Sequence, residues 1–184
     1  EFKPIQQDVS RGVQVLDNLL LLARLDPEQK ESLAKTKFDL SLLMRDVMKA
    51  LQPFASSKQI EINVVLAEQA CVLANEQLLF SALRNLLDNA IRYSPEQAQV
   101  FVNLTIEKQQ LRLRIENSGN EVDAVVIQRL GERFYRALGT KTQGSGLGLS
   151  ICQKIVDLHA GQLLFSSSDL GGLKVELLLN RVEA

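Results

Sequence analysis

The chain has 184 residues, of which 46% are hydrophobic and 23% charged, a composition typical of a folded domain with one sizeable core. Its 21 Lys and Arg residues nearly balance its 22 Asp and Glu residues, and the net charge of −1 argues against nucleic acid or an anionic membrane as a general partner. Two distant cysteines, Cys71 and Cys152, and a single histidine, His159, argue against thiolate or multi-histidine metal sites and indicate a reducing compartment.

The N-terminal part of the sequence predicts a helix that needs a packing partner. Its apolar residues recur at alternating steps of four and three, at Val9, Val13, Leu16, Leu20 and Ala23. Because a lone helix with so much apolar surface is marginal in water, we expect it to pack on a second molecule or on its own chain. The proline and the charges of residues 26–31 then predict a linker.

We expect no membrane segment within this chain. Its longest apolar run, at residues 19–23, is far shorter than the roughly 20 residues that cross a bilayer. Residues 1–4 lack the basic and then apolar order of a secretory signal. They also lack an initiator Met, so we expect a processed chain or a fragment of a longer one.

After the linker, hydrophobic periodicity predicts a domain of mixed helices and strands. Helices are expected around 41–51, 75–93, 123–130 and 147–159, and strands at 60–66, 100–107, 111–116, 162–166 and 173–179. The strands at 100–107 and 111–116 alternate cleanly and predict an antiparallel hairpin with one face exposed to water. Helices beside a mixed, largely antiparallel sheet correspond to a two-layer α+β fold.

The predicted helix at 75–93 carries an unusual polar face. Asn85, Asn89 and Arg92 stand at i, i+4 and i+7, on the side opposite the leucines. Glu and Lys are better helix formers for an exposed position, so two Asn one turn apart suggest that their carbonyl oxygens have a ligand. A hard cation such as Mg²⁺ that also carries phosphate oxygens would suit them. The alternative is that both amides are surface residues or caps of nearby loops.

Three later segments are further candidates. Residues 144–149, Gly-Ser-Gly-Leu-Gly-Leu, bring backbone amides to a helix N-terminus where an anion can sit, or form a flexible turn without a ligand. Residues 116–119 close a strand with a short amide side chain, or are only a turn after the hairpin. Residues 132–136 interleave cations with aromatics, and Lys141 follows, so they suit a loop that closes on phosphate or an aromatic plug.

In this order and with these gaps, the segments resemble the ATP-binding catalytic region of bacterial sensor histidine kinases, in the Bergerat class shared with gyrase-type and Hsp90-type ATPases. Residues 85–93 look like the N box of that family, 117–119 like its first glycine box, 132–136 like its F box and 144–149 like its second glycine box. Residues 16–26 look like the end of the second helix of the dimerisation and phosphoacceptor hairpin. Within the family, residues 92–95 and 131–136 are most similar to QseC-type sensors.

The resemblance implies a two-layer α/β sandwich of the Bergerat type with an N-terminal helix. It divides the chain into part of the second hairpin helix at 1–26, a linker at 27–36 and the ATP-binding catalytic domain at 37–184. The residues that it implies for ATP binding are Asn85, Asn89, Arg92, Tyr93, Asn117, Gly119, Arg136, Lys141, Gly144, Gly146, Leu147 and Gly148.

The same resemblance implies a role for each group of residues. Asn89 is a Mg²⁺ ligand with Asn85 beside it, and Arg92 and Tyr93 lie on the phosphate and ribose side. Arg136 and Lys141 contact the γ-phosphate, while Gly144, Gly146 and Gly148 shape the lid hinge and the phosphate cradle. No catalytic base is implied within the chain, because in such kinases it lies beside the acceptor histidine.

The sequence departs from the family pattern in two places. In the first glycine box, Asn117 replaces an Asp that accepts a hydrogen bond from the adenine amino group, and Glu121 replaces a glycine. The Asn carbonyl can still accept that bond, as a weaker neutral interaction. The phosphoacceptor histidine segment is absent, and His159 is expected in a helix-end role, where a positive charge is favourable near the C-terminal dipole.

The resemblance therefore implies a protein-histidine kinase fragment that transfers the γ-phosphoryl of Mg·ATP to a histidine on a hairpin segment absent from this chain. It also implies relay to a response regulator, contact with its own hairpin, a homodimer in the full-length parent, and a cytoplasmic domain of a bacterial inner-membrane protein. One alternative is a hydrolytic Bergerat ATPase, disfavoured because Asn85 stands where such enzymes carry a Glu base. Another is a nucleotide-binding scaffold without transfer activity.

Overall fold

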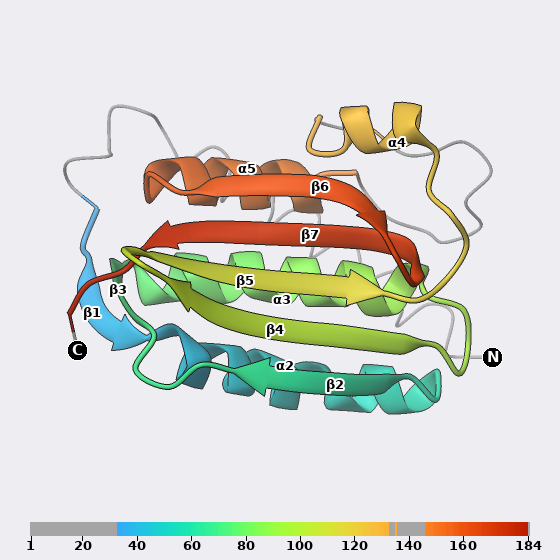
Figure 1. Cartoon of the computed structure of the whole chain (residues 1–184), viewed down its shortest axis with the longest axis horizontal. Coiled ribbons are helices and arrows are strands. Elements are labelled where there is room, and N and C mark those ends of the chain that lie inside the picture. The colour runs from blue at the N-terminus through green and yellow to red at the C-terminus, as the bar shows by residue number, and fades with distance from the viewer. Residues whose placement is uncertain (1–32, 133–134, 136–145, 184) are drawn as a thin grey trace, which may run out of the picture.

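A mixed five-stranded sheet packs with one face against three helices, so the domain has two layers (Figure 1). The computed structural model describes residues 33–132, 135 and 146–183. In chain order, the elements are β1 Thr36–Asp39, α2 Leu40–Ser57, β2 Glu61–Leu66, β3 Cys71–Ala74, α3 Glu76–Tyr93, β4 Gln99–Glu107, β5 Gln110–Asn117, α4 Ala124–Arg129, α5 Gly148–Leu158, β6 Gln162–Ser168 and β7 Gly171–Asn180. No helix in these ranges is long and apolar enough to cross a membrane.

The sheet confirms the predicted mixed, largely antiparallel arrangement. Its strand order is β2-β4-β5-β7-β6, with β2 parallel to β4 and every other pair antiparallel. The predicted hairpin is β4–β5, where Glu107 pairs with Gln110. Along β5, Leu111, Leu113 and Ile115 are buried against the helices while the alternate side chains are only half-buried, which confirms the exposed face.

Helix α3 lies between α2 and α5 and forms the centre of the helical layer (Figure 1). The Asn75 side chain caps its first turn by accepting a hydrogen bond from the backbone N–H of Leu78 at 3.0 Å. The helix ends at Tyr93 because Pro95 favours an extended Ser94. Between these ends, its buried face consists of Leu79, Ala82, Leu83, Leu86, Leu87, Ala90 and Ile91.

The structure differs from the prediction in α2 and in a second, small sheet. Helix α2 continues to Ser57 through Pro53, beyond the predicted end near residue 51. Proline removes one backbone hydrogen bond, but Phe54 packs against the core and Ala55 is buried, so tertiary packing carries the helix past it. Strands β1 and β3 pair antiparallel in a two-stranded sheet that was not predicted, since each has only four residues.

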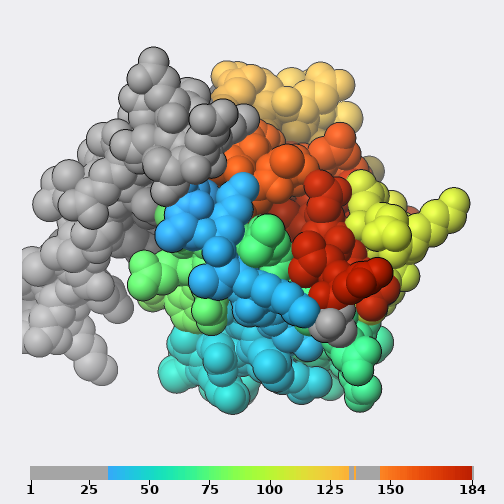
Figure 2. Space-filling model, turned by 90° about the vertical axis from the view of Figure 1, so that its left-hand side faces the viewer, coloured from blue at the N-terminus to red at the C-terminus, as the bar shows by residue number. Residues whose placement is uncertain are grey.

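The small sheet lies at the end of the domain where the chain also finishes. On the face shown in Figure 2, β1 (blue) lies beside the C-terminal residues (red). The backbone N–H of Val182 donates to the Cys71 carbonyl of β3 at 3.0 Å, and this bond joins the C-terminal residues to the small sheet. The predicted N-terminal helix and most of the predicted linker lie outside the described residues, and the described part of residues 27–36 includes Thr36, the first residue of β1.

His159 links the C-terminal end of α5 to the start of α3. Its Nε2 accepts a hydrogen bond from the backbone N–H of Asn75 at 3.0 Å, so its Nδ1 carries the proton and donates to the Ile155 carbonyl at 2.7 Å. The predicted position at a helix end is confirmed. The predicted reason, a positive charge near the helix dipole, is wrong, because burial lowers the pKa of this imidazole and Nε2 can accept from the Asn75 N–H only in the neutral ring.

We expect stability to fall as the pH is lowered from about 7.5 to 5.5. The folded-state pKa of His159 lies below its ordinary value of 6.5, so the unfolded chain binds the extra proton first and acid favours unfolding. For one titrating group, the free energy of unfolding cannot change by more than about 1.4 kcal/mol per pH unit. Urea unfolding at several pH values measures it, and His159→Gln should flatten the dependence. Equal slopes for the two chains would contradict this assignment.

Candidate functional site

The outward face of α3 carries the polar residues predicted from the sequence. The predicted residues Asn85, Asn89 and Arg92 fall within one stripe of the helix together with Asp88, which was not predicted. All four are half-buried, while the leucines pack on the other side. Helices α2 and α5 flank this stripe. The fold therefore forms a polar strip with helical walls.

The N-terminus of α5 lies directly against this strip. A Cβ placed on Gly148, the first residue of α5, would lie 3.9 Å from Cγ and Oδ1 of Asn85. Gly146 has a φ of +70°, which side-chain-bearing residues rarely adopt, and Leu147 is buried in the core. The glycines and the buried leucine thus fix the start of α5 beside Asn85.

The two asparagines of the strip have polar atoms available for a ligand. Within the described ranges, the side chains of Asn85 and Asn89 form no hydrogen bond, and neither has a polar atom that is fully buried. In the same ranges, no three His, Cys, Asp or Glu side chains gather closely enough to hold a metal ion. A hard cation here would therefore be held by amide oxygens together with oxygens of its own ligand and water, a donor set that suits Mg²⁺.

Arg92 points along the strip toward α2. Its guanidinium forms two hydrogen bonds to the Asp88 carboxylate, at 2.9 and 3.0 Å, and lies 5.3 Å from the ring centroid of Phe54. The adjacent Tyr93 is 45% exposed. The predicted phosphate contact of Arg92 would compete with Asp88 for the same guanidinium.

Lys58, just after α2, holds the C-terminal end of α3 and was missed in the sequence. Its ammonium donates hydrogen bonds to the carbonyl oxygens of Ile91, Arg92 and Ser94. Burial is the main cause that lowers the pKa of Lys58, followed by the nearby charge of Arg92. No sequence pattern could reveal this role, since the partners are backbone groups more than 30 residues away.

Asn117 and Gly119 lie at the same end of α3. A Cβ on Gly119 would contact Cδ of Pro95 at 3.4 Å, which places the turn after β5 beside the end of the helix. The Asn117 side chain is buried, and its Oδ1 accepts a hydrogen bond from the backbone N–H of Leu173 at 3.2 Å. Its predicted free carbonyl is thus already bonded within the sheet.

The remaining predicted residues are only partly covered. Arg136, Lys141 and Gly144 lie outside the described residues, as do residues 133 and 134 of the F-box segment. Of that segment, Glu132 forms an ion pair with Arg129 at 3.0 Å, and the Arg129 guanidinium lies 4.1 Å from the ring centroid of Tyr135. These contacts join the segment to α4.

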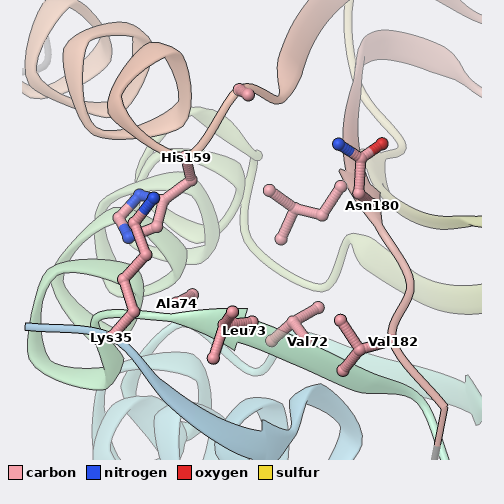
Figure 3. Close-up of a pocket in the computed structure, with 9 residues that line it drawn as sticks. Lys35, Val72, Leu73, Ala74, His159, Asn180 and Val182 are labelled. Atoms are coloured by element: carbon pink, nitrogen blue, oxygen red, sulfur yellow. The ribbon is translucent and has the colours of Figure 1, made fainter. Parts of the chain in front are cut away.

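A cavity of about 250 Å³ lies beside His159 (Figure 3). Lys35, His159, Val72 and Val182 are among the residues that line it. It lies next to the first turn of α3, because His159 is bonded to the N-cap residue Asn75, whereas the strip occupies the second half of the helix. The cavity and the predicted site are therefore separate features.

Comparison with known proteins identifies the family of the domain. Residues 74–183, from the last residue of β3 to beyond β7, match the family described as "Histidine kinase-, DNA gyrase B-, and HSP90-like ATPase". The chain belongs to this family. Its curated relatives place it among the sensor histidine kinases, so it is a histidine kinase catalytic domain that binds ATP, and the predicted family and Bergerat fold are confirmed.

Two sensor proteins illustrate the likeness. The chain is 35% identical to sensor protein QseC of Escherichia coli O157:H7 over 94% of its length, and 32% identical to sensor protein kinase PmrB of Pseudomonas aeruginosa over 97%. It spans only 38% of the length of each of these relatives.

Solved structures show the same fold. The nucleotide-free catalytic domain of histidine kinase ThkA aligns with a TM-score of 0.74 at 27% identity, covering 80% of this chain and 96% of that domain. ThkA in complex with response regulator protein TrrA aligns with a TM-score of 0.76 at 22% identity, covering 97% of this chain and 49% of the other.

Proposed function

We propose that the histidine kinase catalytic domain binds Mg·ATP along the polar strip of α3 and transfers the γ-phosphoryl group to a histidine on a hairpin segment that this chain lacks. The observation that carries the proposal is a pair of amides, Asn85 and Asn89, that form no hydrogen bond within the described part of the chain, with Asn85 beside the N-terminus of α5. Here oxygen ligands for a hard cation lie beside a helix end that favours anions, a combination that suits a metal–phosphate ligand.

Each part of the strip has a role in this proposal. Asn89 holds Mg²⁺ through its amide oxygen, with Asn85 beside it. The backbone at residues 146–148 receives the phosphates, and Arg92 and Tyr93 lie toward the phosphate and ribose side. We propose phosphate contacts for Arg136, Lys141 and Gly144, and contacts to the base end for Asn117 and Gly119. Mg²⁺ would neutralise phosphate charge, and the protein would contribute mainly positioning.

Transfer is favoured over hydrolysis by the residue chemistry of the strip. A hydrolytic enzyme of this class needs a base to activate water, and Asn85 occupies that position. An amide cannot accept the proton. The acceptor must therefore be activated elsewhere, which is consistent with a base beside a histidine on a separate segment.

The proposal extends to partners and to the longer protein. We infer that residues 1–26 are the end of the second hairpin helix, 27–36 a linker and 37–184 the catalytic domain. A response regulator would receive the phosphoryl group from the hairpin, and the parent would be a homodimer in the bacterial inner membrane with this domain in the cytoplasm. The ThkA complex with a response regulator protein supports the class of partner.

Phosphoryl transfer should occur only in trans. With γ-labelled ATP and Mg²⁺, this chain should stay unlabelled, because His159 is buried and both its ring nitrogens are bonded. Transfer without in-line positioning would forgo about 7 to 11 kcal/mol of barrier lowering. Adding a hairpin polypeptide with an acceptor histidine should give acid-labile label on the hairpin. Label on His159, or an unlabelled hairpin, would contradict the proposal, and His159→Gln should leave the transfer unchanged.

The metal role of Asn89 predicts a specific loss. Asn89→Ala should abolish the increase in ATP affinity that Mg²⁺ produces, because it removes a ligand oxygen, and we expect a loss of at least about tenfold in Mg·ATP affinity. Calorimetric titration with a non-hydrolysable ATP analogue, with and without Mg²⁺, measures this. Asn180→Ala, on an exposed Asn at the end of β7, is the matched control. Full Mg²⁺ enhancement in Asn89→Ala would show that the ligand is another group.

A further inference from the structure

The amide of Asn117 has a fixed orientation. Its Oδ1 accepts a hydrogen bond from the backbone N–H of Leu173 at 3.2 Å, and its Nδ2 donates to the backbone carbonyl of Ser118 at 3.3 Å. Exchanging the two atoms would place a donor against the Leu173 N–H and an acceptor against the Ser118 carbonyl. The backbone therefore decides which way the amide lies.

The neighbouring strand prevents the side chain from moving away. A Cβ on Gly172 would lie 2.6 Å from Nδ2 of Asn117, so β7 packs on the amide as closely as only glycine allows. Gly171, with a φ of +100°, packs on the Gly119 carbonyl in the same way. Asn117 is only 5% exposed, and β5, β7 and the turn after β5 together hold it in one position.

This amide lies at the end of the domain where the polar strip finishes. Gly119 is next to Pro95, two residues beyond the end of α3, while Asn85 lies against the start of α5. A nucleotide whose phosphates lie at Asn85 and Asn89 would extend its base toward Asn117. This step rests on the proposed function.

We propose that Asn117 makes the base end of this site accept guanine as well as adenine nucleotides. A carboxylate has only acceptors, so it pairs with the 6-amino group of adenine and repels the 6-oxo group of guanine. The Asn117 amide retains one Nδ2 proton and one Oδ1 lone pair beyond its backbone bonds. It can donate to a 6-oxo group or accept from a 6-amino group, so the 6-position of either purine can form a hydrogen bond with it.

The test compares two ligands on the same chain. The dissociation constants of non-hydrolysable ATP and GTP analogues, measured by calorimetry with Mg²⁺, should differ by less than about tenfold. A site built to bond one polar group rejects an analogue that lacks it by about 10⁴-fold. A preference above about a hundredfold for the adenine analogue would overturn the inference. Binding of neither analogue would overturn the proposed function, and this inference with it.

Replacing Asn117 with Asp should restore discrimination between adenine and guanine nucleotides. Asn117→Asp keeps an acceptor for the Leu173 N–H but replaces Nδ2, with its bond to the Ser118 carbonyl and its remaining proton, by a carboxylate oxygen, so the preference for adenine should rise at least tenfold. The ratio of the two dissociation constants is measured on one variant, so a partial loss of stability affects both ligands equally and cancels. Asn180→Asp is the matched control, and its ratio should equal that of the wild-type chain. An unchanged ratio in Asn117→Asp would overturn the inference.

If this variant does not fold, the wild-type chain is titrated with a hypoxanthine nucleotide analogue instead. Its dissociation constant should lie within about tenfold of that of the adenine analogue. A hundredfold weaker affinity for the hypoxanthine analogue would overturn the inference.

Discussion

The rotation of α3 about its own axis is the constraint on which the rest of the site depends. Leu79, Leu83 and Leu87 are fully buried on one side of the helix, and each contributes about 1.5 to 3 kcal/mol by leaving water. Turning the helix by one residue would expose leucines and would bury amides without partners. The leucines thus fix where Asn85 and Asn89 point, although they take no part in the chemistry.

The ends of α3 are held by polar groups from other elements, and this connects packing to function. Asn75 and His159 hold its first turn, while Lys58 and Ser94 bond the last carbonyl groups. These contacts leave the second half of the helix as a rigid support between the start of α5 and the turn after β5. A site for a ligand with phosphates and a base needs such spacing between elements that are far apart in sequence.

Long periodic segments were predictable, and contacts between distant segments were not. The helix at 75–93 and the hairpin at 100–116 were predicted correctly, because burial of one face leaves a repeat in the sequence. The short strands β1 and β3 leave no such repeat. Of the candidate site, the stripe on α3 and the start of α5 were predicted, but neither Lys58 nor the bond from Leu173 to Asn117 was, since both depend on backbone groups of other elements.

We propose that the strip on α3, and not the cavity beside His159, binds the nucleotide. The side-chain amide resonances of Asn85, Asn89 and Asn117 report on the site directly in a nuclear magnetic resonance titration with a non-hydrolysable Mg·ATP analogue. We predict saturable shifts of these three amides, whereas the amide of Asn180, which lines the cavity, should not shift. Shifts of Asn180 and of the His159 ring without any change at Asn85 and Asn89 would contradict it.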